Sequence, residues 1–318
     1  MKLYYLPFEK DLKDLDTRIL NVESINDKSP DMIKDLKALK KERLKQIEKI
    51  YPNLTSWERV QLARHPNRPY SLDYIKYFSP DFIELHGDRH FMDDPAVVTG
   101  FGYLGGKKIA WVGQQKGRST KENLKRNFGM MRPEGYRKAL RIMRLAEKFN
   151  LPIITFIDTM GAYPGIGAEE RGQGEAIARN LIEMSSIEVP IIGVVIGEGA
   201  SGGALGIGLC DWFLMMENTW YSVISPEGCA SILYHDASKA ESAAESLKLI
   251  PNDLRKLGIC DDVVSEPEGG AHRNFEKSAK SLETAILNGL AKFSKHTPDQ
   301  LMENRIEKYN KLGYFKET

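Results

Sequence analysis

A glycine-rich segment, residues 197–204 (GEGASGGA), follows an apolar run that ends at Ile196 and precedes a short segment that begins at Leu205. This pattern predicts a buried strand, a tight turn and the first turn of a helix. Backbone N–H groups at a helix start lack intrahelical partners, and the helix dipole is positive there. Because no side chain stands in the way, the segment is suited to hold an oxyanion or a phosphate.

Three functional motifs overlap in this segment. A G-x-G-x-x-G pattern starts at Gly197, and Glu217 lies twenty residues farther on, which is the spacing of a dinucleotide-binding fingerprint. Ser201 is the centre of G-x-S-x-G, the nucleophile elbow of hydrolases. Gly202 and Gly203 at a helix start also suit an oxyanion hole for a thioester. Close packing of a helix against a strand needs similar glycines, so these short motifs alone decide little.

The first two hypotheses find little support elsewhere in the chain. A hydrolase needs an acid and a histidine beside Ser201. His235 and His272 are available downstream, but neither stands in an informative context. A dinucleotide-binding fingerprint usually follows the first strand of a domain, whereas several predicted strands and helices precede this one. Both hypotheses stay open on the pattern alone.

Residues 116–144 carry ten Lys and Arg against two Glu, a local net charge of +8 in a chain whose formal net charge is +1. Such an excess attracts polyanions, although a solvated helix face is the more ordinary explanation. Here the excess begins in a loop, residues 116–120, directly after a predicted strand, where ligands of α/β folds bind. No RNA- or DNA-binding motif accompanies the charge, which argues against a nucleic-acid partner.

A second glycine-rich turn, residues 158–165 (DTMGAYPG), also follows a predicted strand, and its backbone is free to approach a ligand. Asp158 is either a catalytic group or a turn-capping aspartate. His86 and His90 have the spacing H-x-x-x-H. A metal site of this spacing requires a helix, and Gly87 argues against one. The sequence therefore favours no metal site.

The composition is that of an ordinary globular protein, with 318 residues, 42% hydrophobic and 28% charged. The N-terminus lacks the apolar core of a secretory signal, and no apolar stretch is long enough for a membrane span. The three cysteines, Cys210, Cys229 and Cys260, are too far apart for a C-x-x-C zinc site, and their odd number argues against a disulfide framework. A cytoplasmic protein with free thiols is expected.

Two amphipathic helices are predicted within residues 1–55, because apolar residues recur there at spacings of three and four on either side of Asn26 and Pro30. Their apolar stripes need a partner surface, either the main domain or another chain. Beyond them, strands and helices alternate. Strands are predicted at 97–103, 108–113, 153–158, 191–196, 212–216 and 263–264, and helices at 133–150, 169–186, 237–257 and 274–295.

Longer motifs narrow the functional alternatives. They are QKGR at 115–118, RNFGM at 126–130, RPEGYRKA at 132–139, the segment 153–165, GAEERGQ at 167–173, the segment 195–203, YSVISPEGCA at 221–230 and GGAHR at 269–273. Together with LARHP at 62–66 and the helical N-terminus, they resemble the alpha subunits of bacterial acetyl-CoA carboxylase carboxyltransferases over nearly the whole chain. Met160 is a departure, because the family usually has proline there in a D-T-P-G-A-Y-P-G turn.

The resemblance implies an α/β, crotonase-like fold, a spiral of repeated β-β-α units, over residues 56–318, preceded by an N-terminal helical hairpin, residues 1–55. It implies transfer of a carboxyl group from carboxybiotin, on a biotin carrier protein, to acetyl-CoA, giving malonyl-CoA for fatty acid synthesis. The implied partners are a beta subunit with a four-cysteine zinc ribbon, in an α2β2 assembly, and biotin carboxylase. No bound cofactor or metal is expected on this chain itself.

The implied chemistry needs N–H donors more than a side-chain base, because negative charge develops on the ureido oxygen of biotin and on the thioester oxygen. Gly202 and Gly203 are therefore expected to act in catalysis at one of these two oxygens. The residues expected to bind substrate are Lys116, Arg118, Arg126, Gly161 and Gly199. A hydrolase built on Ser201 and a non-enzymatic scaffold remain alternatives, and the sequence does not assign most of CoA to one subunit.

Overall fold

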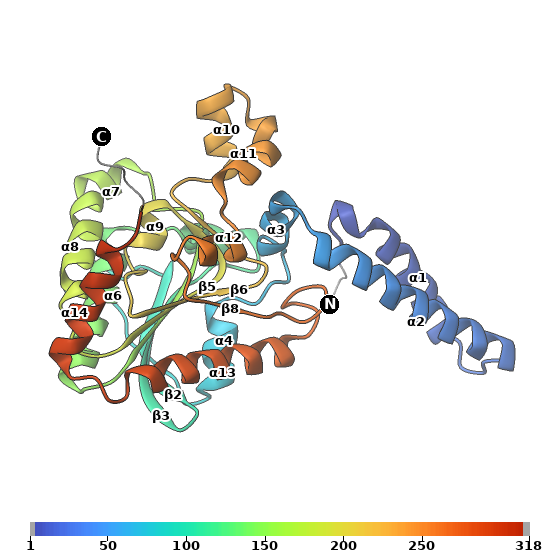
Figure 1. Ribbon diagram of the computed structural model, residues 1–318, viewed down its shortest axis with the longest axis horizontal. Helices are drawn as coiled ribbons and strands as arrows, with labels where there is room; N and C mark the ends of the chain where they lie inside the picture. The colour runs from blue at the N-terminus through green and yellow to red at the C-terminus, as the bar shows by residue number, and fades with distance from the viewer. Residues whose placement is uncertain (1–3, 314–318) are drawn as a thin grey trace.

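An eight-stranded sheet forms the centre of the computed structural model, which describes residues 4–313 (Figure 1). The strands are β1 (Ile83–Glu84), β2 (Val97–Leu104), β3 (Lys107–Gln114), β4 (Ile153–Thr159), β5 (Ile191–Ala200), β6 (Trp212–Met216), β7 (Trp220–Ser222) and β8 (Asp262–Val264). Their order is β1-β2-β3-β4-β5-β6-β8, and β7 pairs with the last residues of β5. The pairing is antiparallel from β1 to β3 and parallel from β3 onward.

Helices cover both faces of this sheet. β4 and β5 are buried at every residue, as expected for parallel strands between two helical layers. On one face, α6 (Pro133–Lys148) and α8 (Gln173–Ser185) bury a core that includes Tyr136 and Met184. On the other face, α4 (Ser71–Phe78) and α13 (Phe275–Phe293) bury a core that includes Tyr74 and Ile286. The two cores fix the parallel strands, so that β3, β4 and β5 end at the same edge.

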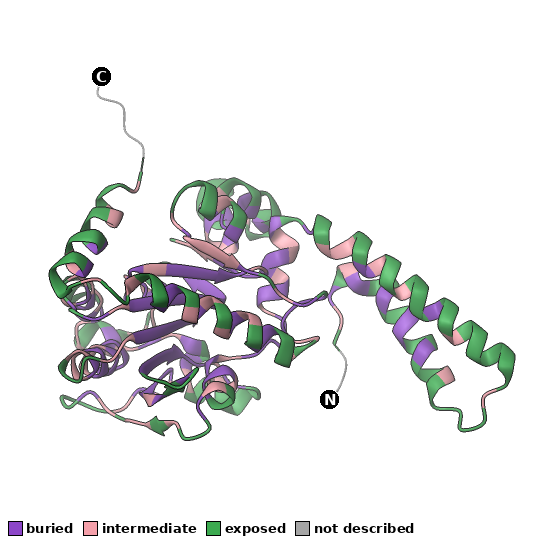
Figure 2. Cartoon of the chain, turned by 60° about the horizontal axis from the view of Figure 1, so that its bottom comes forward, coloured by how far each residue is buried: buried purple, intermediate pink, exposed green. Residues whose placement is uncertain are grey.

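The two predicted N-terminal helices are present as α1 (Lys10–Glu23) and α2 (Pro30–Ile50), which project together from the body (Figure 1). Their apolar stripes largely cover each other, because Leu15, Ile19 and Leu39 form a cluster of their own. The outward faces are exposed (Figure 2). At the base of the hairpin, the buried carboxylate of Glu9 pairs with Arg273 at 3.1 Å. The division into two domains stays a prediction.

The predicted strands and helices beyond the hairpin are present, with two corrections to their bounds. The helix predicted at 169–186 is divided into α7 (Ile166–Glu170) and α8, because Gly172 between them has φ of +81°. β5 does not end at Ile196 but continues through Ala200, so the first half of the glycine-rich segment is strand rather than turn. The prediction missed several short elements. They are α3 (Ser56–Ala63), α4, β1, α5 (Thr120–Lys125), β7, α10 (Pro226–Tyr234) and α14 (Pro298–Asn310).

The region predicted as helical at 237–257 holds α11 (Ala240–Leu247) and α12 (Pro251–Lys256), broken near Pro251 as expected. The short helix predicted after the glycine turn is α9 (Ser201–Leu205). Among the described helices, none combines the length and hydrophobicity that a membrane crossing requires.

Candidate functional site

Two glycine turns meet where β4 and β5 end. α9 begins at Ser201, directly after β5, and the 158–165 turn leaves β4. A Cβ atom on Gly203 would lie 2.3 Å from the carbonyl carbon of Gly161 and 2.7 Å from the backbone nitrogen of Ala162. Only glycine permits that approach of two backbones. The close approach places the N-terminal turn of α9 directly against the 158–165 turn.

The side chain of Gln114, at the end of β3, holds these two turns together. Its Oε1 accepts a hydrogen bond from the backbone N–H of Asp158 at 3.0 Å, and its Nε2 donates to the carbonyl oxygen of Gly203 at 2.7 Å. Nε2 also lies 3.4 Å from Sδ of Met131. The Gln114 residue has no solvent exposure. One amide therefore links the ends of β3 and β4 to α9.

A buried chain of charges lies beside this linkage. Lys116 Nζ lies 2.7 Å from Asp158 Oδ1 and 2.7 Å from Glu198 Oε2. Glu198 also pairs with Arg64 at 2.6 Å, and its backbone N–H donates to Asp158 Oδ1 at 3.0 Å. Burial opposes the charge on Lys116, but Asp158 and Glu198 outweigh it and raise the pKa of the amine. The positive charge of Lys116 is therefore shared by two carboxylates.

The other two predicted anion-binding residues lie around the same loop. Arg118 donates to the carbonyl oxygens of Pro66 and Arg68 at 3.1 and 2.9 Å, pairs with Asp73 and stacks over Tyr70 at 4.0 Å. Arg126 donates to the carbonyl oxygen of Pro95 at 2.8 Å. Within residues 4–313, Arg126 makes no ion pair with a carboxylate, so its charge is less neutralised than the charge of Lys116 or Arg118. Their roles in binding substrate stay predictions.

A small cavity of about 150 Å³ opens at the buried charges. Tyr70, Phe128 and Met160 line one part of it. The polar part of the wall comprises Arg64, His65, Lys116, Asn123 and Glu198. The Met160 side chain, at the position where the sequence departs from the expected proline, is 49% exposed. The departure therefore places a flexible thioether at the rim of the cavity rather than in the core.

Phe128 reaches this cavity from a strained loop. Asn127, Phe128 and Gly129 have φ of +47°, +55° and +79° in succession. This conformation costs a non-glycine residue about 1 kcal/mol or more, and such strain often marks a functional segment. A Cβ on Gly129 would lie 2.7 Å from the carbonyl oxygen of Asp158, so the loop is pressed against the end of β4.

The hydrolase hypothesis lacks its histidine in this structure. Ser201 is exposed and has φ of +55°, which resembles a nucleophile elbow. However, no hydrogen bond joins Ser201 to an imidazole in the part of the chain that is described. His272 stacks on His65, with ring centroids 3.7 Å apart, and both of its ring nitrogens are buried without a hydrogen-bond partner. His235 is exposed at the end of α10.

The dinucleotide-binding hypothesis loses its phosphate loop. That motif needs its first two glycines in the turn between strand and helix, whereas Gly197 and Gly199 both lie inside β5. Glycine is required at both positions because a side chain would collide with its neighbours. A Cβ on Gly197 would lie 2.3 Å from Asp158 Oδ1, and a Cβ on Gly199 would lie 2.6 Å from the ring of Tyr221.

The H-x-x-x-H pair lies in a loop. His86 Nδ1 lies 3.0 Å from Asp93 Oδ2. Across the described residues, no three His, Cys, Asp or Glu side chains gather closely enough to hold a metal ion. The three cysteines are free and buried.

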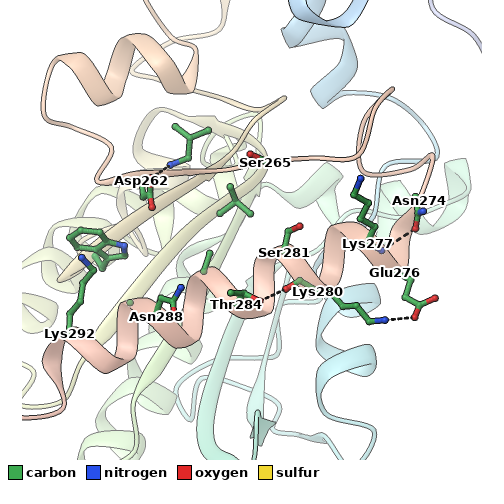
Figure 3. Close-up of a pocket in the computed structure, with 15 residues that line it drawn as sticks. Asp262, Ser265, Asn274, Glu276, Lys277, Lys280, Ser281, Thr284, Asn288 and Lys292 are labelled. Carbon is green, nitrogen blue, oxygen red and sulfur yellow. Dashed lines mark hydrogen bonds and ion pairs between the residues drawn. The ribbon is translucent and has the colours of Figure 1, made fainter. Parts of the chain in front are cut away.

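A larger hollow, about 790 Å³, lies along α13 beside β8 and contains none of the predicted site residues (Figure 3). Polar and apolar groups share its wall, with Lys277, Lys280 and Lys292 projecting from the helix and Asp262 on the β8 side. Lys292 Nζ lies 4.0 Å from the centre of the Trp212 ring. Size alone therefore does not locate the functional site.

Sequence reasoning missed Gln114, and it named Arg132 only as one of the ten cations of residues 116–144. Gln114 stands next to the QKGR motif, but nothing local shows that its amide reaches residues far along the chain. Arg132 stacks over the ring of Tyr163 at 4.7 Å, and its Nε is buried without a hydrogen-bond partner. The local signal for Arg132 was its place within the RPEGYRKA motif.

Comparison with known proteins identifies the family of this chain. A family model described as acetyl co-enzyme A carboxylase carboxyltransferase-like matches residues 5–313. The chain belongs to this family. The acetyl-coenzyme A carboxylase carboxyl transferase subunit alpha of Campylobacter concisus is 53% identical over 98% of this chain and 99% of its own length. The protein of the same name from Exiguobacterium sibiricum is 54% identical over 96% and 99%.

Solved structures of low identity share the fold. Transcarboxylase 12S with hydrolysed methylmalonyl-coenzyme A superposes with a TM-score of 0.56 at 19% identity, over 74% of this chain and 45% of that chain. A Pseudomonas malonate decarboxylase hetero-tetramer in complex with coenzyme A gives 0.58 at 14% identity, over 73% and 90%. The predicted crotonase-like fold is confirmed.

Proposed function

We propose that this chain is the alpha subunit of an acetyl-CoA carboxylase carboxyltransferase, which transfers a carboxyl group from carboxybiotin to acetyl-CoA and forms malonyl-CoA. The observation that carries the proposal is the meeting of two glycine turns, Gly161–Ala162 and Gly202–Gly203, at the ends of adjacent parallel strands, in a chain of this family. Biotin on its carrier protein supplies the carboxyl group. Acetyl-CoA is the acceptor.

The chain's own contribution is a set of backbone donors. The first N–H groups of α9 have no carbonyl partner within the helix. Gly202 is half-buried, and Gly203 is buried against the 158–165 turn. The N–H groups of Gly202 and Gly203 would donate to an oxygen that gains negative charge, either the ureido oxygen or the thioester oxygen. Loss of one such contact typically costs about 3 kcal/mol of transition-state stabilisation. Gly161 and Gly199 shape the approach to these donors.

The cations beside this turn would hold the anionic parts of the reactants. Lys116 supports the site through the two carboxylates that it neutralises, and Arg118 lines the loop over Tyr70. Arg126 is the predicted residue whose charge is least neutralised, because no carboxylate lies within 4 Å of it among the described side chains. We therefore expect Arg126 to contribute more to substrate binding than Arg118.

The proposal includes a partner. We infer that a beta subunit of similar fold, carrying a zinc ribbon, completes the active site in an α2β2 assembly in the cytoplasm, and that a biotin carrier protein and biotin carboxylase supply the activated group. The names of the relatives and the exposed apolar side chains near the site, including Ile166, Leu205 and Val223 at 78, 42 and 80% exposure, support a protein partner.

The test is formation of malonyl-CoA from acetyl-CoA and carboxybiotin by the chain mixed with a beta subunit of this family. The mixture should be active, and either chain alone should not. Full activity of this chain alone would refute the partnership. A folded assembly that forms no malonyl-CoA would refute the function. Labelling of Ser201 by a fluorophosphonate would instead favour the hydrolase.

A further inference from the structure

We propose that Gln114 is a positioning residue of the carboxyltransferase site, whose amide sets the distance between the two glycine turns and thereby aims the N–H donors of α9. This inference rests on the proposed function. It assigns no contact with substrate to Gln114, because the side chain is completely buried and its amide is occupied by groups of the protein.

The need for such a residue follows from the shortness of α9. A helix of five residues has few hydrogen bonds of its own, and isolated short helices are unstable. The N–H of Gly206 donates to the carbonyl oxygen of Gly202 at 3.0 Å, and the N–H of Ile207 to that of Ala204 at 3.4 Å. The carbonyl oxygen of Gly203 instead accepts from Gln114 Nε2 at 2.7 Å. The orientation of α9 therefore depends on a contact from outside the helix.

The same amide fixes the second turn. Gln114 Oε1 accepts from the N–H of Asp158, one residue before the 159–161 segment in which Thr159 Oγ1 accepts from the N–H of Gly161 at 3.2 Å. One rigid, planar group thus bonds to both turns at once. A shift of about 1 Å in the reacting geometry costs on the order of 100-fold in rate, so loss of this link should reduce turnover more than binding.

Glutamine is the residue type that this position requires, because the site needs one donor and one acceptor from the same planar group. Methionine has a similar volume but offers neither bond. A glutamate can accept from Asp158 N–H, but its ionised form would place a second acceptor against the Gly203 carbonyl oxygen. Only the protonated form of such a glutamate would restore the donor.

The charges around position 114 oppose ionisation of a glutamate there. Asp158 and Glu198 lie close by with Lys116 between them, and Arg64 takes up the far side of Glu198. Lys138 Nζ donates to the carbonyl oxygen of Val97, the residue paired with Gln114, and is itself neutralised by Asp93 at 2.7 Å. Lys116 is already neutralised by its two carboxylates, so burial and the remaining negative charge should raise the pKa of an introduced carboxyl.

The experiment compares Gln114→Met and Gln114→Glu with the wild type in the assembled complex with the beta subunit. For Gln114→Met, kcat should fall about 10- to 100-fold while KM for acetyl-CoA and for the biotin substrate changes less than about threefold. For Gln114→Glu, kcat relative to the wild type should rise as the pH is lowered from 8 to 6, because protonation restores the donor.

Gln115 supplies the matched control. It is also buried, its Oε1 accepts from the N–H of Leu72 at 2.8 Å, and its Nε2 donates to the carbonyl oxygen of Lys116 at 2.7 Å. Gln115→Met therefore removes the same number of backbone hydrogen bonds without touching α9, and should lower the melting temperature while keeping kcat within about threefold.

Equal kcat values for Gln114→Met and Gln115→Met would overturn the inference. If the methionine variant does not assemble, the glutamate variant decides, since a kcat ratio that is flat from pH 8 to 6 would overturn the inference as well. An active wild type with unaffected Gln114 variants refutes only the positioning role. An inactive wild-type complex refutes the proposed function instead.

Discussion

The close approach of the two glycine turns gives a sharp prediction for alanine at position 203. A methyl group there would meet the carbonyl carbon of Gly161 at 2.3 Å and its oxygen at 2.4 Å. These atoms belong to the backbone, so no side chain can rotate away. Reaching an ordinary contact requires the turns to separate by about 1 Å, and overpacking of this kind costs about 1–3 kcal/mol of stability. The same displacement should lower kcat about 100-fold.

Gly202→Ala is the matched control. A Cβ there would meet Cδ1 of Ile177 at 3.2 Å and its Cγ2 at 4.0 Å, both atoms of one flexible side chain. Alanine is also a better helix former than glycine by about 1 kcal/mol. Gly202→Ala should therefore keep its melting temperature, whereas Gly203→Ala should lower it; Gly202→Ala is a control for stability alone, because Gly202 is itself an expected donor.

The assay is malonyl-CoA formation by assembled complexes, with assembly checked by light scattering and stability by thermal unfolding. If Gly203→Ala keeps the kcat of the wild type and the melting temperature of Gly202→Ala, the close packing of the turns is not needed for activity, and the reasoning fails. A bulkier Gly203→Val should be worse than Gly203→Ala in both measurements.

Three further predictions concern charge and nucleophilicity. Lys116→Met leaves the carboxylates of Asp158 and Glu198 without their shared cation. Its free energy of unfolding in denaturant should be about 3–5 kcal/mol lower than that of the wild type at pH 8, and the difference should be smaller at pH 6, where a carboxyl can bind a proton. Equal differences at both pH values would contradict this prediction. Ser201→Ala should keep kcat within about threefold because it leaves the backbone donors in place, and a complete loss of turnover would revive the hydrolase. Burial, and then His65 and Arg273, lower the pKa of His272 to about 2. The stability that a neutral His272 gives is therefore complete above pH 6.5 and is lost as the pH falls. In urea unfolding, the free energy of unfolding of the wild type should fall between pH 7.5 and 5.5 by about 1 kcal/mol more than that of His272→Phe, and parallel stability curves would contradict the assignment.

Local patterns were sufficient for the elements that surround the site. Gly105-Gly106 between two strand-like runs predicts the β2–β3 hairpin, and proline at the start of an amphipathic run predicts α6, which begins at Pro133. β4 was visible as a short apolar run that ends at Asp158. These features depend on residues close together in the chain, which is why a pattern can show them.

Local patterns could not show the contacts that form the candidate site, because these contacts join residues far apart in the sequence. Gln114 and Gly203 are 89 positions apart, and Lys116 and Glu198 are 82 positions apart. The +8 charge of residues 116–144 suggested free cations, but folding brings carboxylates from β4 and β5 to Lys116. The length of β5 was underestimated for the same reason, since its glycines at Gly197 and Gly199 are explained by the side chains that pack against them rather than by a turn.

The carboxylate of Asp158 is enclosed by hydrogen bonds and by glycines. Its Oδ1 accepts from Lys116 Nζ and from the N–H of Glu198, and its own N–H donates to Gln114. Gly197 and Gly129 are glycine where a Cβ would collide with Asp158 Oδ1 and with its carbonyl oxygen. A carboxylate so enclosed, and only 2% exposed, has no room for a reactant. Asp158 is therefore suited to hold the ends of three strands and the strained loop in one geometry. In the proposed mechanism, the groups that meet a developing negative charge are therefore the N–H donors of the adjacent turns.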